Sequence, residues 1–165
     1  MIFVTVGTHE QPFDRLIKVM DDWAERNDEE VVIQTGFSEY QPRHCKWQKL
    51  FPYEEMEKYI SKARIVITHG GPSSFIMPLQ IGKTPIVVPR QVEYKEHINN
   101  HQIEFCKAVA NRRRTIIVVE KINMLEHTIE NYNQIIRGLE TGLNSNNEKF
   151  CKDLSHIIDD MFRRE

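Results

Sequence analysis

Short apolar segments alternate along this chain with segments in which apolar residues recur at helical spacing. The apolar segments are rich in β-branched residues, which predicts strands buried on both faces. Predicted strands span residues 2–6, 30–34, 46–50, 65–68, 85–88 and 115–119. Predicted helices span residues 13–26, 53–62, 74–81, 96–111, 122–137 and 147–163. Because strands that alternate with helices form βαβ units, the pattern indicates an α/β fold with a mainly parallel, Rossmann-like sheet and helices on both faces.

The end of the chain has a different pattern. We expect one domain over residues 1–143, followed in residues 144–165 by a polar turn and an amphipathic C-terminal helix. The apolar side of this helix either closes the domain's own core or docks a partner. Its residues are Phe150, Leu154, Ile157, Ile158, Met161 and Phe162.

Composition and charge narrow the classes of function. The 165 residues, 40% of them hydrophobic, suffice for one ordinary core. The formal net charge of -2 provides no positive field for nucleic acid. Three cysteines without metal-site spacing indicate reduced thiols. The N-terminus has no signal-peptide pattern, and no segment reaches about 18 apolar residues. We therefore expect a cytoplasmic chain without a membrane span.

A glycine-rich turn follows the predicted strand 65–68. Residues 69–74 read His-Gly-Gly-Pro-Ser-Ser and lead into a predicted helix. Glycines let a ligand approach the backbone, and hydroxyls beside unpaired helix N–H groups suit an anion, so the turn indicates a phosphate cradle. The alternative is a tight strand-to-helix connection, since the Walker lysine and the dinucleotide G-x-G-x-x-G are both absent. The candidate residues are His69, Gly70, Gly71, Pro72, Ser73 and Ser74.

A second polar group follows the predicted strand 85–88. Arg90 ends this segment, and residues 96–102 read Glu-His-Ile-Asn-Asn-His-Gln. Such side chains hydrogen-bond sugar hydroxyls or phosphate oxygens, which makes Arg90, His97, His101 and Gln102 candidates. The alternative is a solvated helix start. His97 and His101 also have i,i+4 spacing for a shared metal, although no third ligand is evident nearby.

Two more segments supply candidates for the same edge of the sheet. Gly7 and Thr8 follow the first strand. There the Thr8 hydroxyl and the backbone N–H groups after it could face a phosphate, and the alternative is a plain β–α loop. Pro52, Tyr53 and Met56 lie at a helix start, where they wall a base or pack into the core.

Taken in order, four motifs resemble family 28 glycosyltransferases of the GT-B type. They are Val-Thr-Val-Gly-Thr at 4–8, Thr-His-Gly-Gly-Pro-Ser-Ser at 68–74, Gly-Lys-Thr-Pro-Ile-Val-Val-Pro-Arg at 82–90, and the segment 96–102. More narrowly, nearly the whole chain resembles the cytosolic subunit of bacterial two-component exopolysaccharide glycosyltransferases. It also resembles the eukaryotic subunit that adds the second N-acetylglucosamine to dolichol-linked sugar. The resemblance implies the donor-binding C-terminal half of a GT-B enzyme.

The resemblance also implies roles for individual residues. The diphosphate of a UDP-sugar would lie on Gly71, Ser73 and Ser74, with help from Thr8. Pro52, Tyr53 and Met56 would lie by the uracil, and His101 and Gln102 would face the donor sugar. Related enzymes place a ribose-binding glutamate where this chain has Met77, so ribose contacts must come from elsewhere.

The implied reaction is an inverting transfer from a UDP-sugar. Since no Asp-x-Asp pair occurs, we expect no metal and no other cofactor. His9 and Glu96 are candidate bases, with the partner as the alternative source. The implied partners are a membrane-anchored acceptor-binding subunit, which recruits the chain to the inner face of the cytoplasmic membrane, and a lipid-linked sugar acceptor. The alternatives are a non-catalytic nucleotide-binding or scaffolding subunit and a metal-dependent hydrolase built on His97 and His101.

Overall fold

The computed structural model describes residues 1–139 and 147–162. Within these residues, six strands form one sheet in the order β3-β2-β1-β4-β5-β6, and every neighbouring pair is parallel. The strands are β1 (Ile2–Thr5), β2 (Val31–Gln34), β3 (Lys46–Gln48), β4 (Ile65–His69), β5 (Ile86–Val88) and β6 (Ile117–Val118). The strand order reverses between β1 and β4, where α/β sheets bind ligands. The predicted Rossmann-like α/β fold is confirmed.

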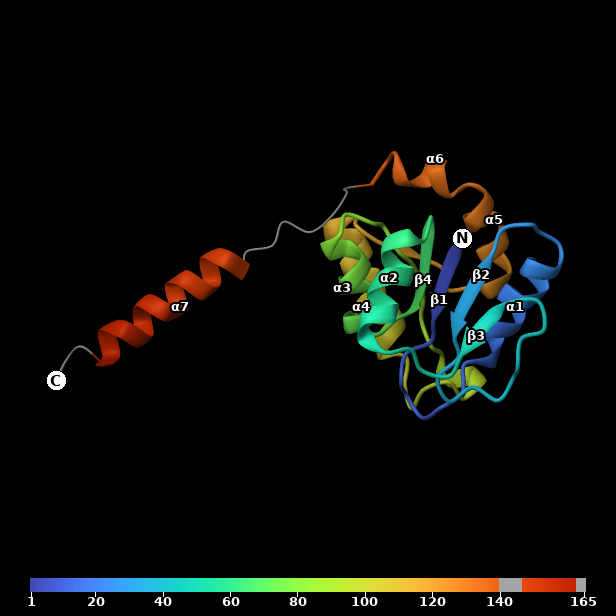
Figure 1. Cartoon of the computed structure of the whole chain (residues 1–165), viewed down its shortest axis with the longest axis horizontal. Coiled ribbons are helices and arrows are strands. Elements are labelled where there is room, and N and C mark those ends of the chain that lie inside the picture. The colour runs from blue at the N-terminus through green and yellow to red at the C-terminus, as the bar shows by residue number, and fades with distance from the viewer. Residues whose placement is uncertain (140–146, 163–165) are drawn as a thin grey trace.

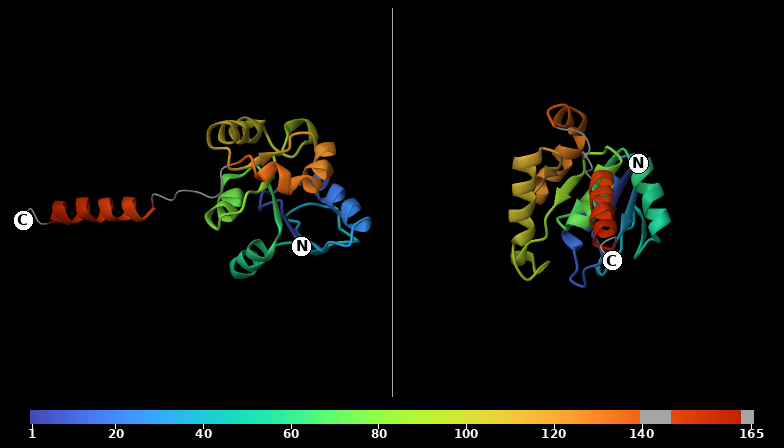
Figure 2. Two further views of the ribbon diagram at one scale, coloured as in Figure 1. Left: turned by 90° about the horizontal axis from the view of Figure 1, so that it is seen from above. Right: turned by 90° about the vertical axis from the view of Figure 1, so that its left-hand side faces the viewer.

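Helices cover both faces of the sheet (Figure 1 and Figure 2). One face carries α1 (Asp14–Glu25), α5 (Leu125–Glu130) and α6 (Tyr132–Ile136). The other face carries α2 (Tyr53–Lys62), α3 (Pro72–Gln80) and α4 (His101–Arg113). Successive side chains of a strand point to opposite faces of the sheet, so they pack alternately with the two groups of helices. In β1, Ile2 and Val4 pack with α1, whereas Phe3 packs with α2.

Two predicted helices differ from the structure. The helix predicted for 96–111 begins only at His101, because Glu96 turns inward and Lys95 adopts a left-handed conformation with φ 59° after a 3₁₀ turn, η1 (Val92–Tyr94). The helix predicted for 122–137 is divided into a 3₁₀ turn, η2 (Ile122–Met124), and the helices α5 and α6. At this break the carbonyl of His127 accepts from both the side chain and the backbone N–H of Asn131.

The C-terminal helix α7 (Asn147–Phe162) stands apart from the sheet and its covering helices (Figure 1). Its apolar stripe is exposed from Phe150, at 59%, to Phe162, at 79%. The stripe therefore does not close the core of the domain. The turn predicted at the start of the tail, residues 144–146, lies outside the described residues. Among the residues that are described, no helix is long and apolar enough to cross a bilayer.

Candidate functional site

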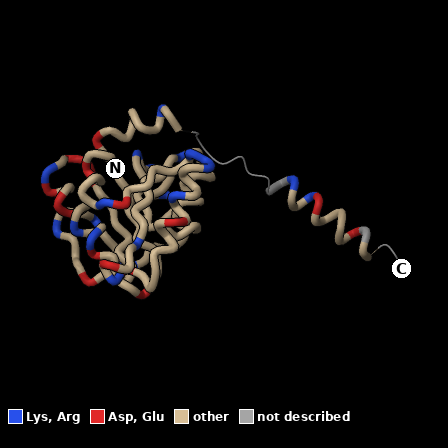
Figure 3. The backbone as a smooth tube through the Cα atoms, turned by 180° about the vertical axis from the view of Figure 1, so that it is seen from behind, with Lys and Arg blue, Asp and Glu red and all other residues tan. Residues whose placement is uncertain are grey.

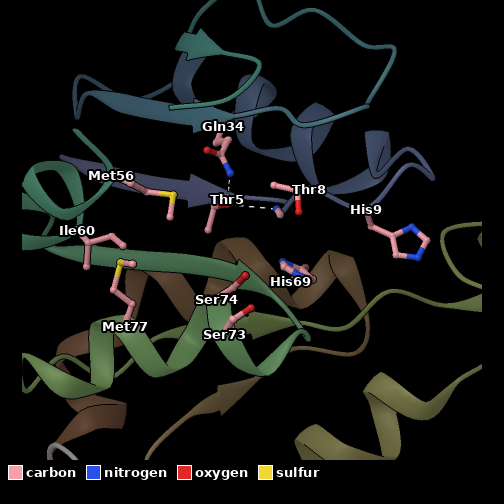
Figure 4. Close-up of a pocket in the computed structure, with 11 residues that line it drawn as sticks. Thr5, Thr8, His9, Gln34, Met56, Ile60, His69, Ser73, Ser74 and Met77 are labelled. Carbon is pink, nitrogen blue, oxygen red and sulfur yellow. Dashed lines mark hydrogen bonds between the residues drawn. The ribbon is translucent and has the colours of Figure 1, made fainter. Parts of the chain in front are cut away.

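A cavity of about 520 Å³ opens at the carboxyl ends of β1 and β4, where the strand order reverses (Figure 4). Loops after these strands and the first turn of α3 contribute its polar part, and α2 and the body of α3 close the other side. Its lining residues are Thr5, Gly7, Thr8, His9, Gln34, Met56, Ile60, His69, Ser73, Ser74 and Met77. We call this cavity the β1–β4 pocket. Its position is the one at which doubly wound sheets hold nucleotides.

The β1–β4 pocket has two chemically different ends (Figure 4). Met56, Ile60 and Met77 form an apolar end, while hydroxyls and imidazoles gather at the other. No Lys, Arg, Asp or Glu is among the residues that line it. Charged residues of both signs are instead interspersed over the domain (Figure 3). An anion in this pocket would therefore be held by neutral hydrogen-bond donors and a helix N-terminus.

The N-terminus of α3 lies at the polar end of the β1–β4 pocket. Gly71 is its N-cap and makes no side-chain cap bond, and Pro72 follows at the first helical position, where the missing N–H costs nothing. Ser73 and Ser74 come next, and both line the pocket. Their hydroxyls thus lie at the positive end of the helix dipole, as the sequence predicted for a phosphate cradle.

His69 is the buried imidazole of the pocket, whose other buried polar residues are Thr5 and Gln34. Its ring fills the space between Gly7 and Gly71, because a Cβ on either glycine would overlap it. The residue is only 8% exposed. Burial, reinforced by the nearby charge of Arg90, lowers the pKa of His69 to about 4. The imidazole is therefore neutral near pH 7.

The floor of the pocket is an ordered network around Thr5. Its Oγ1 accepts from the Gly7 backbone N–H at 3.2 Å and from the Gln34 amide at 3.0 Å (Figure 4). The Gln34 carbonyl oxygen accepts from the Phe51 N–H. These bonds hold the turn after β1, and with it Gly7 and Thr8, against the end of β2.

Three residues predicted to contact the donor are instead engaged inside the protein. Arg90 is fully buried, and its guanidinium donates to carbonyls that include those of Val6, at 2.9 Å, and Gln11, at 2.7 Å. The Gln102 amide oxygen accepts from the backbone N–H groups of Gly70 and Arg90, each at 3.1 Å. These contacts join the loops after β1, β4 and β5, so Arg90, Gln102 and Gly70 position the edge of the sheet.

The two candidate bases also have internal partners. Glu96 is 3% exposed, and its carboxylate accepts from Arg15 at 2.8 and 2.9 Å and from the backbone N–H of Gln91. His9 lines the pocket, and its Nδ1 accepts from the Gln11 N–H at 3.2 Å. Neutral His9 then carries its proton on Nε2, which suits donation to an oxygen better than proton abstraction.

A row of three imidazoles continues outward from the pocket. The rings of His9 and His97 are 5.0 Å apart, and those of His97 and His101 are 4.5 Å apart. The tertiary structure thus brings His9 to the pair that the sequence singled out. No group of metal-ligating side chains that could hold an ion is found in residues 1–139 and 147–162.

The remaining predictions divide between the pocket and the surface. Met56 lines the pocket, whereas Pro52 and Tyr53 do not, and Tyr53 is 62% exposed at the start of α2. Sequence reasoning missed the lining residues Thr5, Gln34 and Ile60, and it noted Met77 only as a substitution. Thr5 and Gln34 are polar residues that end buried apolar strands, a signal that was available.

Comparisons with known proteins agree with this architecture. The chain is similar to a solved glycosyltransferase described as that of kitacinnamycin, with 14% identity and a TM-score of 0.53 over 78% of this chain and 34% of the other. It is also similar to the glycosyltransferase SnogD from Streptomyces nogalater, with 18% identity and a TM-score of 0.47 over 72% of this chain and 30% of that one. This chain therefore spans about a third of the length of these proteins. No curated protein is significantly similar in sequence. Residues 1–158 match the model of the glycosyltransferase family 28 C-terminal domain, and the chain belongs to that family.

Proposed function

We propose that this chain is the donor-binding catalytic subunit of a two-component inverting UDP-sugar glycosyltransferase. It would act on a lipid-linked acceptor in exopolysaccharide or capsule biosynthesis. The observation that carries the proposal is the two-ended β1–β4 pocket of a family 28 domain. Thr8, Ser73 and Ser74 offer hydroxyls at the N-terminus of α3, and an apolar wall lies opposite.

The pocket matches the parts of a nucleoside diphosphate. The diphosphate would lie on the α3 terminus and its serines, and the planar uracil would lie against Met56 and Met77. Met77 replaces the glutamate that grips ribose in related enzymes, and this makes the base end of the pocket apolar rather than acidic. The proposal is metal-independent, because neutral donors and the helix dipole would meet the charge of the departing UDP.

In the transfer step, an acceptor hydroxyl oxygen would form a bond to the anomeric carbon of the donor sugar. The bond from that carbon to the β-phosphate oxygen would break, and UDP would leave with the electron pair. The acceptor proton needs a base. Because Glu96 is paired with Arg15 and the Nδ1 of His9 is occupied, we assign the base to the partner subunit.

Support for a partner comes from α7, whose described large apolar side chains are exposed. In the proposal, the exposed apolar stripe of α7 docks a membrane-anchored acceptor-binding subunit. That subunit would recruit the cytoplasmic chain to the inner face of the membrane.

Calorimetric titration with UDP in EDTA buffer tests the donor site. Binding should survive chelation and should weaken by about a hundredfold when Ser73 and Ser74 are both changed to Ala, since two hydrogen bonds to a charged group are lost. Ser61→Ala, at an exposed serine of α2, is the matched control and should bind like the wild type. Binding that requires a divalent metal would contradict the metal-free site.

One observation favours a second candidate, a non-catalytic nucleotide-binding or scaffolding subunit. Met77 leaves ribose without its usual acidic partner, which lowers the expected affinity for a donor. If the wild-type chain binds no UDP even with its partner bound, the catalytic proposal fails and the scaffolding role stands.

A further inference from the structure

A second cavity lies at the end of β2, on the side of the sheet that α1 covers. Gln34 lines the first cavity, and the next residue, Thr35, lines the second. The residue after Thr35, Gly36, adopts φ 55° and packs so closely on the carbonyl of Gly7 that a Cβ would overlap it. The second cavity has a volume of about 250 Å³ and is lined by Thr35, Gly36, Phe37, Ser38, Tyr40, Gln41, Trp47 and Lys49. We call it the Phe37–Trp47 pocket.

The lining of this pocket combines aromatic faces with neutral polar groups. Phe37 is 43% exposed and Trp47 is 41% exposed, so both present aromatic surface. Gln41 adds an amide, and Lys49 lies 4.7 Å from the Phe37 ring centroid. A pyranose ring has the complementary surface, because its C–H groups pack on aromatic faces while its hydroxyls need amide and amine partners.

The walls of the pocket are held in place before any ligand arrives. The carboxylate of Asp21, on α1, accepts from the Tyr40 hydroxyl and from the backbone N–H groups of Arg43 and His44. Nearby on the same helix, Asp14 accepts from the N–H groups of Glu39 and Tyr40. A loop without regular secondary structure is thus fixed to a helix. Preorganisation of this kind lowers the ordering cost of binding.

The indole of Trp47 is oriented as well. Its Nε1 donates to the Pro42 carbonyl at 3.1 Å, which fixes the plane of the ring against the loop. Trp47 also joins Tyr40, Gln41 and Arg43 in lining an adjoining hollow of about 440 Å³. Together the two hollows offer room for more than one sugar ring around a single aromatic residue.

We propose that the Phe37–Trp47 pocket binds the carbohydrate part of the glycosyl acceptor. The proposal rests on the proposed transferase function and extends it, since it assigns acceptor contacts to a chain so far given only the donor. The location supports the proposal, because Gly36, which lines this pocket, packs on the carbonyl of Gly7, which lines the β1–β4 pocket. An acceptor sugar held on Trp47 would lie at the same edge of the sheet as the donor.

Fluorescence of Trp47 tests the proposal directly. The chain has two tryptophans, and the other, Trp23, is buried with no hydrogen-bond partner for its Nε1 among the described residues, so Trp23→Phe leaves a folded chain with one reporter. We would titrate this variant with cellobiose, lactose and chitobiose. At least one disaccharide should change the Trp47 emission saturably. Adding Phe37→Ala should weaken that binding by about tenfold through the loss of one aromatic face.

Controls separate this proposal from the donor site. Met124→Ala, at an exposed apolar residue of η2, should leave saccharide binding unchanged, and Phe37→Ala should leave UDP binding unchanged. If none of the three disaccharides alters Trp47 emission at millimolar concentration, the proposal is overturned. It is also overturned if a partner protein, and no saccharide, protects Trp47 from quenching by iodide. Saccharide binding without UDP binding would support the pocket while contradicting the donor proposal.

Discussion

At the scale of single residues, the candidate site depends on the close approach of two glycine backbones to the side chain of His69. Gly7 and Gly71 both contact its ring, and neither position has space for a methyl group. At Gly71 the backbone is extended, with φ -75°, so the requirement for glycine there is steric and not conformational. The two glycines therefore set the place of the one buried imidazole in the pocket.

Gly71→Ala should displace His69 and disturb the start of α3 without unfolding the chain. We expect at least a tenfold loss of UDP affinity, because the hydrogen-bond donors of the cradle move from their places. Calorimetry on the purified variant measures this. Gly138→Ala is the matched control, since a Cβ there meets its nearest atom at an ordinary 3.7 Å. Unchanged affinity in Gly71→Ala would show that the cradle does not bind the nucleotide.

The depressed pKa of His69 makes stability depend on pH in a defined direction. The unfolded chain takes up a proton near the ordinary value of 6.5, whereas the folded chain takes it up at about 4. Between these values the unfolded state binds more protons, so stability falls as pH falls from about 6.5 towards about 4. The loss is at most about 3 kcal/mol.

Urea unfolding at about pH 7 and about pH 5 measures this effect. His69→Gln removes the titrating group, so its free energy of unfolding should fall less across that interval than that of the wild type. His97, whose pKa burial also lowers, remains in both proteins and accounts for part of the residual slope. Equal slopes in the two proteins would contradict the assignment to His69.

At the scale of elements, the β2–β3 connection is held by side chains of α1. Asp21 is 1% exposed and is surrounded by the donors of Tyr40, Arg43 and His44. Burial alone would raise the pKa of this carboxyl, but the hydrogen bonds outweigh it and the pKa is lowered. One carboxylate thus replaces the regular hydrogen bonds that this stretch lacks.

Asp21→Ala should cost about 3 kcal/mol of unfolding free energy, because it leaves three donors without their acceptor. The neighbouring Asp22→Ala, at an exposed position of the same helix, should stay within about 0.5 kcal/mol of the wild type. Urea denaturation of both variants provides the comparison. If Asp21→Ala is as stable as Asp22→Ala, the connection is held by other contacts.

At the scale of the whole molecule, the chain consists of a two-faced α/β domain and a helix, α7, set apart from it (Figure 2). The sides of α7 that are described show no buried residue, and large apolar side chains such as Met161 are more than half exposed. An apolar stripe of this kind on a solvated helix is unusual for a chain that acts alone.

Removal of residues 140–165 should therefore leave the domain's stability almost unchanged. We expect the free energy of unfolding of the shortened chain to lie within about 0.5 kcal/mol of that of the full chain, because the described side chains of α7 are exposed rather than buried against the domain. UDP affinity should also be retained. A loss of stability well beyond this value would show that α7 packs on the domain.

Most of the fold followed from local patterns. Buried strands such as β4 are continuous β-branched runs, and α2 was predicted at its observed bounds because its apolar stripe and the preceding Pro52 mark it clearly. The start of α4 and the break at Asn131 could not be predicted in this way. The start of α4 depends on the pairing of Glu96 with Arg15, which is far away in the sequence. The break at Asn131 accompanies a side-chain bond to the His127 carbonyl, which the spacing of apolar residues does not reveal.

The candidate site also combines features that local sequence patterns predict with features that only tertiary contacts decide. The sequence by itself determined the parallel α/β sheet and the place of the Gly-Gly-Pro-Ser-Ser turn between β4 and α3, because strand patterning and turn chemistry are local properties. Only the tertiary structure decided that Arg90 and Gln102 join loops instead of facing the pocket, and that Gln34 and Met77 line it. The physical reason is that a polar side chain binds whichever partner the packed strands bring to it, and residues far apart in sequence meet only once the sheet has formed.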